Sequence, residues 1–169
     1  MAESTAVTPA QKRIALIAHD HMKDAMVRWC RVNKETLSRH FLCGTGTTAR
    51  LIAENTGLPV EALKSGPFGG DQEVGARIAE GMIDMVIFFS DPLEAQPHDP
   101  DIKALLRIAN VYDVPFANNR ATADFLITSP FMNEKYERVV ENYDKMNAKR
   151  LETIQKEIDE GDRYYTSGR

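Results

Sequence analysis

Four clusters of polar and glycine residues stand in the chain, each directly after a short apolar run. The clusters are HDH with a lysine two residues further on, GTGTT, SGPFGGD, and SDP with HDPD a few residues later. If the apolar runs are parallel strands, their carboxyl ends meet at one edge of a sheet, which is where ligands bind in doubly wound α/β folds. We therefore expect one shared pocket. The candidate site residues are His19, Asp20, Lys23, Thr45, Gly46, Thr47, Thr48, Ser65, Gly66, Asp71, His98 and Asp101.

The GTGTT segment, residues 44–48, is a predicted anion site. Its glycines allow backbone N–H groups to approach a ligand, and its three threonine hydroxyls add donors at the start of a helix. The segment lacks the GxxxxGK[ST] pattern of a nucleotide-binding loop, which favours a monophosphate over a triphosphate. Gly44, Gly46 and Ala49 also match the loose dinucleotide-binding pattern, but that turn normally follows the first strand and here it follows the second. Nicotinamide binding is therefore the weaker alternative.

Asp71 is the candidate base. It stands behind Gly69 and Gly70 at the start of a predicted helix, whose dipole favours an ionised carboxylate. An ionised aspartate can remove a carbon-bound proton only if the resulting enediolate is stabilised by donors, and His19 and His98 are suited to that role. The simpler alternative is that Asp71 is only a helix cap.

A metal site is a further alternative. Histidine and aspartate at positions 19, 20, 98, 99 and 101 are suitable ligands for a divalent cation, but none has HExxH or CxxC spacing. His21 and His40 stand apart and are predicted to be surface or packing residues. Cys30 and Cys43 lack metal-type spacing and lie in or beside apolar segments, which indicates reduced core thiols and no disulfide framework.

The elements that must position these groups alternate between strand and helix. The predicted strands are residues 13–18, 40–44, a short one near 63, 84–89 and 115–118. The runs RIALIA and DMVIFF are continuously apolar, as in strands that are covered on both faces. Between the strands, stripes such as Val74, Ile78 and Met82 have helical period, and Asp99 followed by Pro100 is typical of a helix start. This order predicts βαβ units in a three-layer α/β/α fold with a parallel sheet.

The chain has the length of one domain, 169 residues. We predict an N-terminal extension over residues 1–12, a domain over 13–146, and a C-terminal helical extension over 147–169 with a frayed end. A stripe at Tyr136, Val139, Val140, Tyr143 and Met146 has helical period and predicts that the C-terminal helix begins before the extension.

Composition limits the partners. The formal net charge is −4 and the sequence pI about 5.6, so no global positive field favours nucleic acid or an anionic membrane surface. The N-terminus has no apolar run of signal-peptide type, and no stretch approaches the roughly 18 apolar residues of a membrane span. We expect a cytoplasmic protein that binds a small anion.

The chain resembles the methylglyoxal synthase family from Lys12 to about Tyr143. The segments that carry the resemblance are IALIAHDHMK, GTGTT, SGPFGGDQEVGA, DMVIFFSDPLEAQPHDPDIKALLRIA and NVYDVPFANNRATADFLI. The succession GGDQ, DPL and PHDPD is specific to the family. The resemblance implies a five-stranded parallel sheet of flavodoxin-like or Rossmann-like type and conversion of dihydroxyacetone phosphate to methylglyoxal and inorganic phosphate. It also implies no metal or organic cofactor, a homohexamer and inhibition by phosphate.

The same resemblance assigns roles to single residues. Asp71 matches the family's catalytic base, His98 matches the histidine at the reacting oxygens, and Asp20 and Asp101 match further active-site acids. The matched substrate-binding positions are His19, Lys23, Thr45, Thr47, Thr48, Ser65 and Gly66. A related regulatory domain of carbamoyl phosphate synthetase shares the fold, so a non-catalytic module that binds a small effector is the alternative function.

Overall fold

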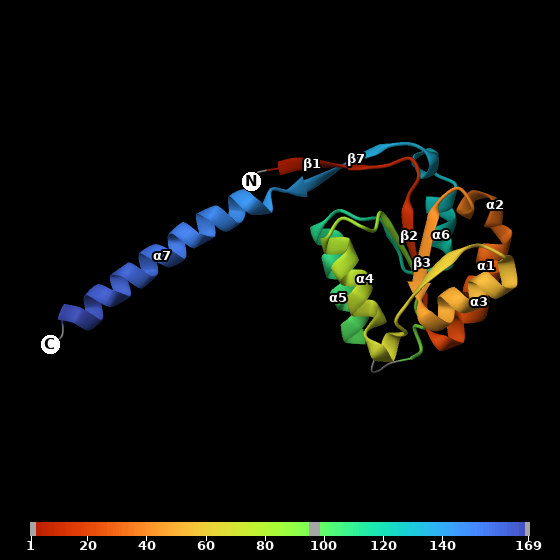
Figure 1. The fold of residues 1–169 in the computed structure, drawn as a ribbon, viewed down its shortest axis with the longest axis horizontal. Helices are drawn as coiled ribbons and strands as arrows, with labels where there is room; N and C mark the ends of the chain where they lie inside the picture. The colour runs from red at the N-terminus through yellow and green to blue at the C-terminus, as the bar shows by residue number, and fades with distance from the viewer. Residues whose placement is uncertain (1–2, 95–98, 168–169) are drawn as a thin grey trace.

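A five-stranded parallel sheet forms the centre of the computed structural model, which describes residues 3–94 and 99–167, with the side chains of 99–101 and 167 outside the described part. The strand order is β4-β3-β2-β5-β6, and Figure 1 labels the central strands β2 and β3. The strands are β2 (Arg13–Ala18), β3 (Phe41–Thr45), β4 (Val60–Leu63), β5 (Met85–Phe89) and β6 (Phe116–Ala117). The sequence predicts β2 without error and the other four to within a few residues, so the predicted five-stranded α/β fold is confirmed.

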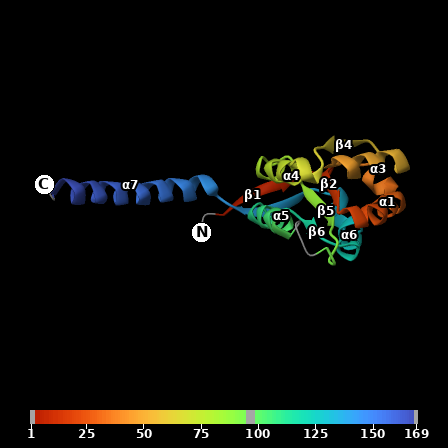
Figure 2. The same cartoon turned by 90° about the horizontal axis from the view of Figure 1, so that it is seen from below.

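Helices cover both faces of the sheet and make three layers. One face carries α1 (Lys23–Val32), α3 (Gly46–Thr56) and α6 (Arg120–Ile127), and the other carries α4 (Gly70–Ala79) and α5 (Asp99–Val111) (Figure 2). A four-residue helix, α2 (Lys34–Leu37), follows α1. Successive strand residues point to opposite faces, so β2 supplies Leu16 to the core beneath α1 and Ile17 to the core beneath α4.

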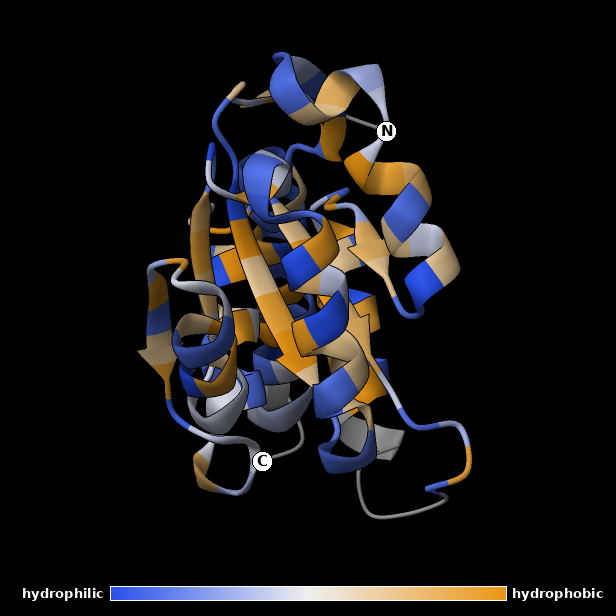
Figure 3. Cartoon of the chain, turned by 90° about the vertical axis from the view of Figure 1, so that its right-hand side faces the viewer, coloured by the Kyte–Doolittle hydropathy of each residue, from blue (hydrophilic) through white to orange (hydrophobic). Residues whose placement is uncertain are grey.

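The continuous apolar runs follow from this burial on both sides. All five residues of β5 are buried, and so are the last five of β2. Figure 3 shows the same pattern as hydrophobic central strands and helices on which hydrophobic and hydrophilic residues alternate. The described helices include none that is long and apolar enough to cross a membrane.

Both ends of the chain differ from the sequence-based expectation. The N-terminal segment forms β1 (Glu3–Thr8), which pairs antiparallel with β7 (Tyr136–Glu141), so the helix predicted from the stripe at Tyr136, Val139 and Val140 is wrong at that place. The physical reason is that pairing with β1, far away in the sequence, overrides a local helical period. Adjacent β-branched valines also suit a strand.

The C-terminal helix begins after β7. Helix α7 (Tyr143–Ser167) starts ahead of the predicted extension at residue 147 and continues through Ser167. It projects away from the sheet domain together with the β1–β7 ribbon (Figure 1).

Candidate active site

A cavity of about 280 Å³ lies at the carboxyl ends of β2, β3 and β4. Its lining contains most of the residues that the sequence selects: His19, Asp20, Lys23, Thr45, Thr47, Ser65, Gly66 and Asp71, with Ile17, Ala18, Pro67 and Phe88 completing the wall. Three of the four predicted clusters therefore meet in one pocket. The parallel direction of the strands brings them there from separate parts of the chain.

His19 is held in one orientation by the segment after β5. Its backbone N–H donates to the carbonyl of Phe89 (3.1 Å), its Nδ1 accepts the backbone N–H of Asp91 (2.9 Å), and its ring meets Phe88 edge to face. Because Nδ1 accepts a hydrogen bond, the proton of the neutral ring belongs on Nε2. His19 is thus prepared to donate a hydrogen bond through Nε2 while remaining uncharged.

The sequence does not reveal that partner of His19. The group that sets the ring's tautomer is the backbone amide of Asp91. A backbone N–H has no signature in the residue type, so only the position of Asp91 directly beyond β5 could have suggested it.

Lys23 brings a positive charge to the pocket. Its Nζ donates to the carbonyl of Ala18 (2.9 Å) and to Oδ1 of Asp20 (2.7 Å). The Lys23 side chain is 16% exposed and the Asp20 side chain 90% exposed, so water screens the carboxylate more than the ammonium. An ammonium has three protons, which leaves Lys23 one more donor for an anionic ligand.

Only part of the GTGTT segment, residues 44–48, lines the cavity. Thr45 ends β3 and Thr47 lies in the first turn of α3, and both line the cavity. Gly46 and Thr48, which were predicted to bind the ligand, do not line it. The Gly46 N–H donates to the carbonyl of Lys64 (3.3 Å), and Thr48 is buried, with no hydrogen-bond partner for its Oγ1 among the described residues.

Asp71 reaches the pocket through a close backbone contact. Helix α4 begins after Gly69, which has φ +93°, and the Gly70 N–H donates to the carbonyl of Ser65 (3.1 Å). A Cβ on Gly70 would lie 2.0 Å from the Lys64 carbonyl oxygen, so only glycine allows this approach. The helix start is thereby pressed against the segment after β4, which brings Asp71 beside Ser65.

The cap alternative for Asp71 is wrong. The N-cap residue of α4 is Gly69, which has no side chain, and Asp71 lies in the first turn. The carboxylate therefore sits where the helix dipole favours its ionised form, and it lines the cavity instead of serving as the cap.

Two predicted site residues cannot be placed. His98 lies outside the described residues, and so does the side chain of Asp101, whose backbone belongs to α5. Residues 3–94 and 102–166 contain no group of three side chains suited to a metal. Because His98, Asp99 and Asp101 are not part of that search, the expectation of no metal stays a prediction.

The remaining histidines and cysteines have the predicted structural roles. His40 is buried, and its Nδ1 accepts a hydrogen bond from the backbone N–H of Lys12 (3.0 Å). His21 is exposed, and its Nδ1 lies 3.3 Å from Oδ2 of Asp91. Cys30 and Cys43 are buried and free. Burial raises the pKa of Cys30 to about 12 and that of Cys43 to about 11, so neither thiol is a nucleophile near neutral pH.

One pocket at the carboxyl edge of a parallel sheet contains a carboxylate at a helix start, a neutral histidine donor and a lysine. The fold and this site together define an α/β enzyme that acts on a small anion. Residues 25–118, more than half of the chain, match the family model described as MGS-like domain. A methylglyoxal synthase of Clostridium acetobutylicum is 59% identical over 138 residues, which is 81% of this chain and 95% of that protein. One from Pectobacterium atrosepticum is 55% identical over 148 residues, 88% of this chain and 97% of that protein.

A solved structure agrees. The crystal structure of methylglyoxal synthase from Elizabethkingia anophelis NUHP1 superposes with a TM-score of 0.80 at 50% identity, covering 83% of this chain and 93% of that one. The chain belongs to the methylglyoxal synthase family, and it is a lyase.

Proposed function

We propose that this chain converts dihydroxyacetone phosphate to methylglyoxal and inorganic phosphate. The observation that carries the proposal is that Asp71, His19 and Lys23 meet in one cavity, which is also lined by Thr45, Thr47, Ser65 and Gly66. The relatives that bear the name methylglyoxal synthase match along most of this chain and most of their own length, which supports the same reaction here.

The phosphate group binds at the polar wall of the pocket. Lys23 supplies one positive charge, and the hydroxyls of Thr45, Thr47 and Ser65 supply donors near the start of α3. Helix N-termini favour such anions because their N–H groups and dipole face the ligand. Holding the phosphate here turns the carbon chain of the triose toward Asp71.

Asp71 then removes a proton from the hydroxymethyl carbon. The negative charge that develops on the substrate oxygens is stabilised by the Nε2–H of His19, because a preorganised donor costs no reorganisation during the reaction. His98 is proposed as the second donor, Asp20 as the acid that orients Lys23, from which it accepts a hydrogen bond, and Asp101 as an acid that orients His98. The role of His98 comes from the family resemblance, which matches Asp20 and Asp101 only to further active-site acids.

The enediolate next expels phosphate. The hydroxyl on the deprotonated carbon becomes a carbonyl and loses its proton, the enediolate double bond shifts to the carbon that carries phosphate, and the carbon–oxygen bond to phosphate breaks with its electron pair leaving on the phosphate. The enol that remains gains one proton on its methylene carbon and becomes methylglyoxal; the other proton released along the way goes to phosphate. Expulsion requires the breaking bond to stand roughly perpendicular to the enediolate plane, so the phosphate-binding segments select elimination over isomerisation.

Further properties belong to the proposal. We place the reaction in the cytoplasm, with no metal or organic cofactor, no nucleic acid and no membrane as partner. Phosphate should inhibit because it is both a product and a fragment of the substrate. A homohexamer would cover apolar side chains that a single chain leaves exposed, among them Val139, Leu151 and Ile158. Light scattering after size exclusion tests the assembly.

Incubation of the pure protein with dihydroxyacetone phosphate tests the reaction. We expect methylglyoxal and inorganic phosphate in equal amounts, and a fall in turnover of about 10³ or more in Asp71→Asn with little change in substrate binding, because this change removes a group that acts in the transition state. Asp144→Asn, on exposed α7, is the matched control and should react normally. Glyceraldehyde 3-phosphate as product, binding without turnover, or normal turnover by Asp71→Asn would each contradict the proposal.

A further inference from the structure

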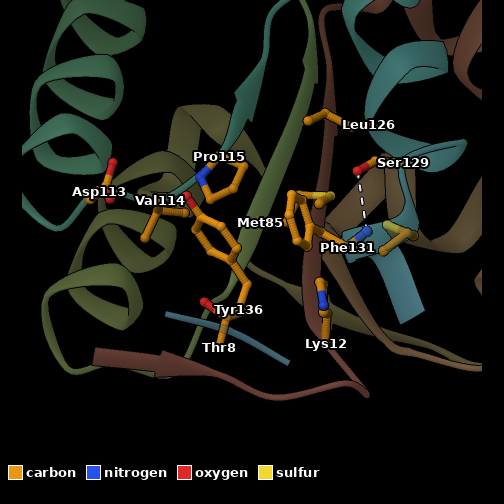
Figure 4. Close-up of a pocket in the computed structure, with 11 residues that line it drawn as sticks. Thr8, Lys12, Met85, Asp113, Val114, Pro115, Leu126, Ser129, Phe131 and Tyr136 are labelled. Carbon is orange, nitrogen blue, oxygen red and sulfur yellow. Dashed lines mark hydrogen bonds between the residues drawn. The ribbon is translucent and has the colours of Figure 1, made fainter. Parts of the chain in front are cut away.

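A second cavity lies at the opposite edge of the sheet from the active site. Its volume is about 250 Å³, and its lining includes Lys12, just before β2, and Met85, the first residue of β5. The other lining residues are Thr8, Asp113, Val114, Pro115, Leu126, Ser129, Phe131, Met132 and Tyr136 (Figure 4). Because the strands are parallel, these amino ends face away from the pocket of His19 and Asp71, and the two cavities share no residue.

Lys12 gives this cavity a buried positive charge. The residue is only 3% exposed, and its Nζ donates to two neutral carbonyls, of Pro9 (3.0 Å) and Glu134 (3.0 Å). One of its three protons is left for another acceptor. Burial lowers the pKa of Lys12, and the nearby Asp84 opposes that shift.

The carboxylate that acts on the pKa of Lys12, that of Asp84, is already engaged. Asp84 accepts three hydrogen bonds from Arg13, from its backbone N–H (2.8 Å), Nε (3.0 Å) and Nη2 (3.0 Å). Among residues 3–94 and 102–166, no carboxylate forms an ion pair with Lys12. A buried ammonium without its own counter-ion is costly, and an anionic ligand would lower that cost.

The walls of the cavity are apolar and aromatic. The rings of Phe131 and Tyr136 lie 4.9 Å apart at 55°, and both residues remain substantially exposed, at 53% and 40%. Aromatic rings pair favourably with a third ring at such distances. A ligand that lies against them would cover apolar surface that a single chain leaves in water.

Two hydroxyls add donors to the lining of the cavity. Thr8 Oγ1 accepts from Arg138 Nε (2.9 Å), and Ser129 Oγ accepts from the Phe131 N–H (3.2 Å), so each hydroxyl proton can still donate. Asp113 also lines the cavity, but it is exposed and lies on the side opposite Lys12 (Figure 4). Water therefore screens its charge from an anion at Lys12.

We propose that this cavity is a second small-molecule site, for an aromatic monocarboxylate. The carboxylate pairs with the Lys12 ammonium, and the ring lies against Phe131 and Tyr136. A single buried cation matches a monoanion better than a phosphate dianion, and the apolar walls require an apolar body, which a free phosphate lacks.

Benzoate is the probe. Calorimetric titration of the full chain in saturating inorganic phosphate, which occupies the active site, should show one benzoate per chain. Benzamide, which has the same ring without the charge, and acetate, which has the charge without the ring, should each bind roughly 10-fold more weakly or worse.

Methyl spectra locate the bound probe. In protein labelled at the methionine methyl groups, benzoate should shift Met85 and Met132, which line the cavity, and leave Met146 on α7 unshifted. Shifts that vanish in phosphate, or that spare Met85 and Met132, would overturn the proposal.

Variants test the two contacts separately. Lys12→Met should weaken benzoate by roughly 10- to 150-fold, the range expected when a charged hydrogen bond is lost, and leave benzamide unchanged. Should this variant fail to fold, Phe131→Ala decides: it should weaken benzoate several-fold, whereas Phe125→Ala, an exposed phenylalanine outside the cavity, should not. Undetectable benzoate binding, or equal effects of the two phenylalanine variants, would refute the assignment.

Discussion

Gly70→Ala tests the contact that brings Asp71 to the pocket. A Cβ at this position would lie 2.0 Å from the Lys64 carbonyl oxygen, and separations below 3.0 Å are essentially never found, so the start of α4 or the segment after β4 must move by about 1 Å. Misplacement by about 1 Å can reduce the rate about 10²-fold, because catalysis depends on the reacting atoms being in near-attack positions. The atom that the new methyl group meets belongs to the backbone, so no side-chain rotation relieves the clash.

Stability should respond as well. Overpacking of this kind costs about 1–3 kcal/mol, and in a protein of this size each kcal/mol lowers Tm by about 2–4 °C. Gly75→Ala on the same helix is the control: its Cβ would lie 3.7 Å from Leu105 Cδ2, an ordinary contact, so better helix propensity should stabilise the protein by about 0.5–1 kcal/mol.

The assay is turnover of dihydroxyacetone phosphate, followed as phosphate release, together with thermal unfolding of both variants. We expect a loss of about 10²-fold for Gly70→Ala and parental turnover for Gly75→Ala. Parental turnover and Tm in Gly70→Ala would refute the reasoning, because the contact would then not position Asp71. An equal loss in both variants would point to a general effect of alanine on α4.

Three further predictions concern buried groups. Thr48→Val removes a hydroxyl that has no partner among the described residues, so without ligand it should raise the free energy of unfolding by about 1 kcal/mol. If Thr48 binds substrate, KM should also rise about 10-fold. An unchanged KM would remove Thr48 from the site. Burial lowers the pKa of His40, so as pH falls the unfolded chain takes up this proton before the folded chain does. The stability advantage of the parent over His40→Gln should therefore be full above about pH 6.5 and shrink as pH falls below it. A constant advantage from pH 7 to 5 would contradict this cause. Burial raises the pKa of Cys30 to about 12 and that of Cys43 to about 11. Mass spectrometry should therefore show both thiols unmodified after iodoacetamide treatment of the native protein at pH 8, and both alkylated in guanidinium. Rapid labelling of the native protein would contradict their burial.

Much of the fold is predictable because its signals are local. β2 and β5 are buried on both faces, so their residues read as unbroken apolar runs, and the Asp99–Pro100 pair indicates the start of α5. The polar clusters beyond the strands are equally visible, and parallel strands must bring them to one edge. Eight of the predicted site residues accordingly line one cavity.

The errors have a different origin. Strand β7 was expected to be helical because Tyr136, Val139 and Val140 have helical spacing, yet its hydrogen-bond partner is β1, at the other end of the chain. A local period cannot report a partner that is more than a hundred residues away, and β propensity depends on that partner. Gly46 and Thr48 do not line the cavity, because a motif identifies a turn but not which atoms of the turn face the ligand; their part in binding stays a prediction.

The sequence by itself determined the order of the five sheet strands and the helices between them, the residue types at the carboxyl edge of the sheet and the family to which the chain belongs, because each of these is encoded in neighbouring residues. Only the tertiary structure decided that the amide of Asp91 orients His19, that Gly70 packs against Lys64, and that Lys12 is buried beside an aromatic cavity. These features depend on backbone atoms and on contacts between distant segments. Backbone N–H and C=O groups are the same in nearly every residue, so their partners are settled only when the chain is folded.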